Sequence, residues 1–166
     1  PKLDAFEQKF KKFTKSKYAV GVSNATAALY LSLKAFGIKK SDEVIIPDLT
    51  FAATANSVLQ TGATPVLADI DKETLNISVE SIMKNISRKT KAIVPVHLAG
   101  TPCDMQKIMK IARSNSLKVI EDCAHGIGTT YNKKHVGNFG NVGCFSFYPT
   151  KNLTTIEGGM VITNEK

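Results

Sequence analysis

The chain has 166 residues, of which 43% are hydrophobic and 22% are charged, values typical of one globular domain. A fold of this size buries enough surface to need no metal or disulfide staple. Cys103, Cys123 and Cys144 are odd in number and form no CxxC pair, so we expect buried free thiols. No run approaches the ~20 apolar residues of a membrane span and no signal-peptide pattern is present, so we expect a cytoplasmic protein without membrane contact.

The net charge of +8 raises the question of nucleic-acid binding. Nucleic-acid-binding proteins favour arginine and gather basic residues on one face, but only Arg88 and Arg113 are arginines here. The densest basic run lies on a predicted amphipathic helix whose apolar side carries Phe6, Phe10 and Phe13. We expect no nucleic-acid partner. We expect the lysines of this run to form a solvated face: Lys9, Lys11, Lys12, Lys15 and Lys17.

Short β-rich runs alternate along the chain with longer helical patterns. The expected strands are 19–22, 44–46, 64–68, 92–96, 118–120, 142–146 and 160–163. The expected helices between them are 25–36, 52–61, 79–86 and 104–115. This alternation predicts one α/β domain, a mostly parallel sheet with helices on both faces. The stretch between the last two strands contains Pro149 and Gly158-Gly159 but no helical pattern, and loops of that length are commonly functional.

Ligands of such sheets bind at the carboxyl ends of the strands, which directs attention to the residues that follow each strand. The first strand leads through Ser23 and Asn24 directly into a helix that begins near Ala25. Free backbone amides and the helix dipole at such a start suit a phosphate, with the Thr26 hydroxyl as a further donor. Simple capping of the helix by Ser23 or Asn24 explains the same residues equally well.

Two carboxylates, Glu121 and Asp122, end an apolar strand, and His125 follows shortly after. One carboxylate could hold a cationic ring nitrogen, while the other caps a helix or turns outward. A metal site is the competing interpretation, with His97, Asp122, Cys123 and His125 as ligands. Adjacent Asp122 and Cys123 on a strand point to opposite faces, which argues against a shared ion.

Lys151 lies five residues beyond Ser146, in the long loop before the last strand. Lysine forms Schiff bases with carbonyl compounds, most readily where desolvation or neighbouring cations lower its pKa. Its place in this loop distinguishes Lys151 from the other lysines of the chain.

Taken together, these segments closely resemble the DegT/DnrJ/EryC1/StrS family, pyridoxal 5'-phosphate (PLP)-dependent sugar aminotransferases of the aspartate aminotransferase fold. The matching motifs occur in fixed order across nearly the whole chain, which makes the resemblance more specific than any one motif. They are Ser23–Leu29, Pro47–Phe51, Gly62–Val66, Pro95–His97, Glu121–His125, Ser146–Asn152 and Glu157–Met160.

The resemblance implies a role for each matching residue. Lys151 would carry PLP in Schiff-base linkage, and Asp122 would pair with the protonated pyridine nitrogen. Phe51 would stack on the ring, and His125 would lie near the phenolic oxygen. The phosphate would be held by the amides of Ala25 and Thr26 and by the hydroxyls of Thr26 and Ser146.

The resemblance also implies the reaction. An amino acid, typically glutamate, would give its amino group to a nucleotide-linked keto-sugar, and Lys151 would move the proton as general base and acid. The product would serve cell-surface polysaccharide or other amino-sugar biosynthesis, and the active enzyme would be a homodimer. The alternative is a catalytically incomplete chain that acts only as a PLP-binding or dimerisation module.

By the same resemblance, the seven strands would form the complete seven-stranded sheet of the PLP-binding large domain, with the last strand antiparallel. Residues 1–166 would be a truncated large domain, without the smaller C-terminal domain of the family. We therefore expect the chain alone to bind PLP weakly and to turn over poorly. Ala25 stands where the family usually has glycine in the phosphate turn. Because alanine disfavours a positive φ, the turn requires a negative φ at this residue.

Overall fold

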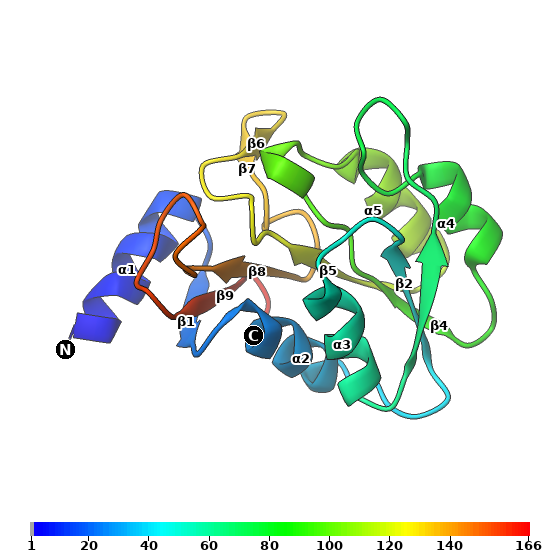
Figure 1. The fold of residues 1–166 in the computed structure, drawn as a ribbon, viewed down its shortest axis with the longest axis horizontal. Coiled ribbons are helices and arrows are strands. Elements are labelled where there is room, and N and C mark those ends of the chain that lie inside the picture. The colour runs from blue at the N-terminus through cyan, green and yellow to red at the C-terminus, as the bar shows by residue number, and fades with distance from the viewer. Residues whose placement is uncertain (1) are drawn as a thin grey trace.

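The computed structural model describes residues 2–166, and its centre is a seven-stranded sheet in the order β1-β9-β8-β5-β4-β2-β3 (Figure 1). The last strand, β9, runs antiparallel to both of its neighbours, and the other pairs in this sheet are parallel. The seven strands are β1 (Tyr18–Val22), β2 (Glu43–Pro47), β3 (Thr64–Ala68), β4 (Thr90–Ile93), β5 (Lys118–Asp122), β8 (Val142–Ser146) and β9 (Gly159–Thr163). The predicted architecture, including the antiparallel last strand, is confirmed.

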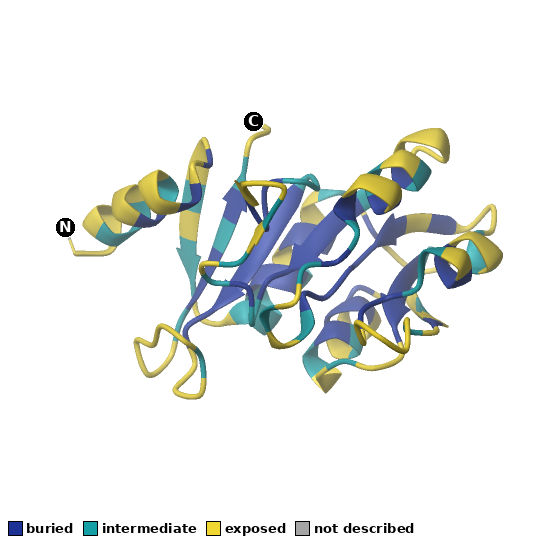
Figure 2. Cartoon of the chain, turned by 90° about the horizontal axis from the view of Figure 1, so that it is seen from above, coloured by how far each residue is buried: buried dark blue, intermediate teal, exposed yellow. Residues whose placement is uncertain are grey.

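Helices cover both faces of the sheet, and alternation along the strands decides which helix each side chain meets. Val44 and Ile46 of β2 pack in the core beneath α2 (Ala25–Ala35) and α3 (Ala52–Gln60). Ile45, between them, packs in the core beneath α4 (Val79–Asn85) and α5 (Met105–Ser114) on the other face. Figure 2 shows the result: the central strands are buried, the edge strands are partly exposed, and the helices expose their outer sides.

The first helix, α1 (Lys2–Thr14), covers the end of the sheet at β8 and β9. Phe10 lies edge-on to Phe145, and Phe6 lies edge-on to Phe147, with 5.1 Å between ring centroids in each pair. Phe13 is 54% exposed and contacts the His135 ring. The lysines of this region are exposed apart from the half-buried Lys11, in agreement with the predicted solvated face.

Two local features differ from the sequence-based expectation. Strand β4 ends at Ile93 rather than Val96, because Pro95 has no N–H, and the chain pairs again with β5 only at a single bridge between Val96 and Asp122. A hairpin of two-residue strands, β6 (Thr130–Tyr131) and β7 (Lys134–His135), was not expected, nor was the 3-10 turn η1 (Leu98–Gly100). Such short elements carry too few residues to show a hydrophobic period.

Two further expectations about the fold are confirmed. All three cysteines are buried free thiols. Residues 147–158 form turns without a helix, as the composition of that loop predicts. Within residues 2–166, none of the helices combines the length and the apolar character needed to cross a bilayer.

Candidate active site

The start of α2 forms one wall of the site. Asn24 is the N-cap, and its side-chain oxygen accepts a hydrogen bond from the Ala27 amide at 2.8 Å. The capping interpretation is therefore correct, and it is compatible with anion binding because the amides of Ala25 and Thr26 have no intrahelical acceptor. Ala25 lies in the helix and is not among the residues with positive φ.

Gly159 of β9 allows a close approach at this wall. A Cβ atom at this position would lie 2.5 Å from the Asn24 carbonyl carbon and 2.9 Å from the Ala25 nitrogen. Only a residue without a side chain lets β9 pass directly beneath the start of α2, so Gly159 sets the position of this turn relative to the sheet.

Glu121 and Asp122 end β5 and face opposite sides of the sheet. Asp122 shares the face of α2 and α3, where Oδ2 accepts from the Thr54 hydroxyl at 2.9 Å and Oδ1 from the Ala124 amide at 3.1 Å. It is 5% exposed, and desolvation raises its pKa above the ordinary value, against the hydrogen bonds from Ala124 and Thr54 and the nearby histidines. A carboxylate so placed favours a cationic partner in the adjoining cavity.

Glu121 is fully buried on the other face and holds the fold together there. Oε1 accepts from the amides of Phe139 and Gly140, both at 2.7 Å, and Oε2 accepts from the Gly137 amide at 2.8 Å. Oε2 also lies 2.9 Å from His97 Nε2. The expectation that this second carboxylate caps a helix or turns outward is wrong, because β5 is covered on both faces.

The metal alternative is explained by the same contacts. His97, Glu121 and Cys123 lie close enough to share an ion, whereas Asp122 points to the opposite face. His97 Nδ1 accepts from the Cys103 amide, which leaves Nε2 as the N–H that donates to Glu121. The polar atoms of His97 and Glu121 thus already have hydrogen-bond partners, so these two residues are accounted for as a buried structural pair.

Lys151 is presented by a tight turn. The Lys151 amide donates to the Tyr148 carbonyl at 2.9 Å, and Pro149 supplies the fixed φ that the second position of such a turn favours. The loop is anchored behind this turn because the Thr154 hydroxyl and the Thr155 amide both donate to the Phe147 carbonyl. The sequence between β8 and β9 thereby aims Lys151 from the end of β8 toward the end of β5.

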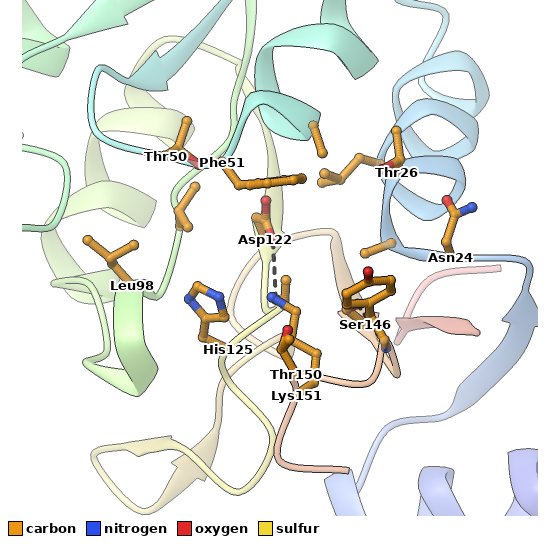
Figure 3. A pocket seen from close by; sticks show the side chains of 16 residues that line it. Asn24, Thr26, Thr50, Phe51, Leu98, Asp122, His125, Ser146, Thr150 and Lys151 are labelled. Carbon is orange, nitrogen blue, oxygen red and sulfur yellow. Dashed lines mark hydrogen bonds between the residues drawn. The ribbon is translucent and has the colours of Figure 1, made fainter. Parts of the chain in front are cut away.

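All of the predicted site residues line one cavity of about 430 Å³. In Figure 3, Asp122 lies between Phe51 on one side and His125 and Lys151 on the other. Phe51 is 78% exposed and holds the N-cap position of α3, so its ring stands free at the cavity mouth. The set that converges there is Ala25, Thr26, Phe51, Asp122, His125, Ser146 and Lys151.

His125 and Lys151 influence one another. His125 Nδ1 accepts from the Ala99 amide at 3.3 Å, which fixes the ring at the cavity wall. Desolvation and, after it, the nearby Lys151 ammonium lower the pKa of His125, so its imidazole stays neutral to lower pH than usual. The two side chains also line a second cavity of about 290 Å³ that adjoins the first.

The sequence profile of the DegT/DnrJ/EryC1/StrS aminotransferase family matches residues 1–166. The chain belongs to this family. Its aminotransferases depend on PLP, and structures of similar chains include PLP and PMP forms.

The proteins similar to this chain include a GDP-perosamine synthase and sugar aminotransferases. GDP-perosamine synthase of Escherichia coli O157:H7 is 51% identical over 164 residues, which are 99% of this chain and 45% of that protein. The aminotransferase of Psychrobacter cryohalolentis superposes with a TM-score of 0.97 at 48% identity, covering 98% of this chain and 42% of that one. Spr1654 of Streptococcus pneumoniae, in its PLP form, gives a TM-score of 0.96 at 31% identity over 100% of this chain and 46% of that one. The chain thus spans less than half the length of these relatives.

The chemistry of the cavity fits PLP. A helix start with unused amides and the Ser146 hydroxyl suit the phosphate, and the buried Asp122 suits a protonated ring nitrogen. Phe51 offers a flat apolar surface, and Lys151 offers the amine for a carbonyl. The cavity therefore has a group of matching chemistry for each part of the cofactor.

Other lining residues escaped the sequence-based assignment. Asn24, Thr50, Tyr148 and Thr150 also face the cavity. Each lies within one of the matching motifs. Membership of a motif could therefore have identified these residues, whereas their residue types alone could not. Thr54 and Glu121 needed the structure, because their partners lie far along the chain.

Proposed function

We propose that this chain forms the cofactor-binding part of an aminotransferase that moves an amino group from an amino acid, glutamate in the first instance, to a nucleotide-linked keto-sugar. The observation that carries the proposal is one cavity lined by Lys151, Asp122, Ser146 and the start of α2. Relatives named for GDP-perosamine and for spore coat polysaccharide synthesis support an amino-sugar product for cell-surface polysaccharide.

The described residues would hold the cofactor in a fixed orientation. The amides of Ala25 and Thr26, with the Thr26 and Ser146 hydroxyls, would bind the phosphate, and Phe51 would pack on the ring. Asp122 would keep the proton on the ring nitrogen, and His125 would lie near the phenolic oxygen. When bound, PLP supplies an electron sink for the carbon that loses or gains a proton.

Lys151 would act twice. Its Nζ would hold PLP between turnovers and, when free, would take the proton from the amino-bearing carbon of the substrate. In the second half of the reaction Nζ returns a proton to the sugar carbon that receives nitrogen. Glutamate thereby becomes a 2-oxo acid, and the ketone becomes an amine.

The remaining properties of the active protein form part of the same proposal. Phe51 and Tyr148, which line the cavity, expose 78% and 48% of their surface, and Ile156 in the loop that carries Lys151 exposes 75%. These exposed apolar side chains support burial against a second copy of the protein. Buried free thiols are typical of a reducing compartment, which supports the cytoplasm. Light scattering of the purified protein tests for the homodimer.

The covalent step has a direct test. The purified protein is mixed with PLP and reduced with borohydride, and its peptides are mapped by mass. We expect the phosphopyridoxyl group on Lys151 in the unaltered protein and in Lys91→Ala, which removes an exposed lysine from β4. Attachment at other lysines, unchanged by Lys151→Ala, would contradict the assignment.

Turnover is tested with glutamate and a panel of GDP-, UDP- and dTDP-linked keto-sugars. We expect Lys151→Ala to lower the rate by at least about 10²–10⁴-fold, the usual contribution of a general base and acid, with Lys91→Ala as the control. PLP attachment at Lys151 without turnover of any sugar would favour the cofactor-binding module instead.

A further inference from the structure

Asp122 is reached by a chain of two hydroxyls. The Thr54 hydroxyl donates to Asp122 Oδ2, and Thr50 Oγ1 lies 2.8 Å from Thr54 Oγ1. A threonine hydroxyl has one proton, and Thr54 gives that proton to the carboxylate. Thr50 must therefore be the donor in its contact with Thr54, so the chain has a direction: Thr50 to Thr54 to Asp122.

The two threonines occupy different surroundings. Thr54 is fully buried in the first turns of α3, while Thr50 is half-buried and lines the cavity. Figure 3 shows Thr50 beside Phe51, on the same side of Asp122. One short segment, 50–54, thus supplies the ring that faces the cofactor and the hydroxyls that bind the carboxylate.

We propose that Thr54, supported by Thr50, is a positioning residue that keeps Asp122 charged and directs its free lone pairs toward the ring nitrogen of the cofactor. The inference rests on the proposed function, which identifies the partner of Asp122 as the ring nitrogen of PLP. With the Ala124 amide on Oδ1 and Thr54 on Oδ2, both carboxylate oxygens are fixed, and rotation of the side chain would break two hydrogen bonds.

The surroundings of Asp122 explain why such support is needed. Burial opposes its charge, and hydrogen bonds from Ala124 and Thr54 favour it. The titratable and charged groups near Asp122 are His97, His125, Lys151, Glu121 and the thiols of Cys103, Cys123 and Cys144. The hydrogen bond at the end of the hydroxyl chain stabilises the charged form of Asp122 and requires no second ion in the core.

The first experiment follows the Asp122 carboxyl by ¹³C NMR in the cofactor-free protein, with Asp122→Asn to assign the resonance. We expect Thr54→Val to move the titration of Asp122 to higher pH, and Thr54→Ser to restore it. Ser57→Ala is the matched control: Ser57 is a buried hydroxyl of the same helix that donates to the Thr54 carbonyl and not to Asp122. An unchanged titration in Thr54→Val, or an equal shift in Ser57→Ala, would overturn the inference.

The second experiment uses ¹⁵N-labelled PLP. In Thr54→Val we expect the pyridine nitrogen to shift toward its unprotonated position and PLP affinity to fall roughly tenfold, the usual contribution of one hydrogen bond to a charged group. Thr54→Ser should retain the signal of the unaltered protein. An unaltered protein that binds no PLP would overturn the proposed function, whereas the cofactor-free titration decides the part played by Thr54 independently.

Discussion

The two carboxylates at the end of β5 are neighbours in sequence and both are buried, yet they are held in different ways. Glu121 receives three backbone amides and the His97 ring, all of them fixed N–H donors. Asp122 receives one amide and one hydroxyl, and faces a cavity. Four donors occupy the acceptor sites of Glu121, whereas the two donors to Asp122 leave acceptor sites free, so the Glu121 face serves the fold and the Asp122 face has bonding capacity for a ligand.

The largest effect is expected on the Glu121 face. In Glu121→Gln one carboxylate oxygen is replaced by an NH2 group, which faces two N–H donors and cannot accept from them. Each buried donor without an acceptor costs ~1–3 kcal/mol. We expect the free energy of unfolding to fall by about 2–6 kcal/mol, measured by denaturant titration. A loss below about 1 kcal/mol would remove the distinction between the two carboxylates.

An intermediate effect is expected at Gly159, which joins the ligand-facing side to the sheet. In Gly159→Ala the new methyl group meets the backbone of Asn24, and we expect a loss of stability of about 1–3 kcal/mol together with weaker PLP binding. Gly21→Ala is the control, because its methyl group comes closest, at 2.6 Å, to the flexible, exposed end of Leu3 and not to backbone. PLP affinity reduced equally in both variants would contradict a special role for Gly159.

The smallest effect, and one of opposite sign, is expected for the stability of Asp122→Asn without cofactor. Desolvation raises the pKa of Asp122 in the fold, so the carboxyl stabilises the fold below its unfolded pKa and this contribution is lost as pH rises through the folded pKa. At neutral pH the neutral amide should therefore leave the free energy of unfolding unchanged or up to about 1 kcal/mol higher. Denaturant titrations at pH 5 and pH 8 measure this, and a loss above 2 kcal/mol would show a structural role for Asp122.

The sequence predicted most of this fold because the evidence for it is local. The strand starting near Val142 and the helix starting at Ala25 each show their own period and boundary residues, and the motifs at their ends point to one edge of the sheet. The seven residues predicted for the site line one cavity at that edge.

The missed features depend on contacts between distant segments. Glu121 binds amides 16 to 19 residues further along the chain, and Thr54 lies 68 residues from Asp122. A glutamate at a strand end and a threonine in a helix are both common, and no sequence pattern around either residue identifies the residue that it contacts. Strand order, which places β8 beside β5, likewise arises from packing that no single segment shows.

The most direct test of the difference between the two carboxylates is the stabilisation that PLP gives to the unaltered protein and to Asp122→Asn. At a concentration 100 times Kd, a ligand specific for the folded state adds about 2.7 kcal/mol to the free energy of unfolding. We predict this gain for the unaltered protein and little or none for Asp122→Asn under the same conditions, although the variant is as stable without cofactor. Equal stabilisation of both proteins by PLP would contradict the assignment of Asp122 to the ligand.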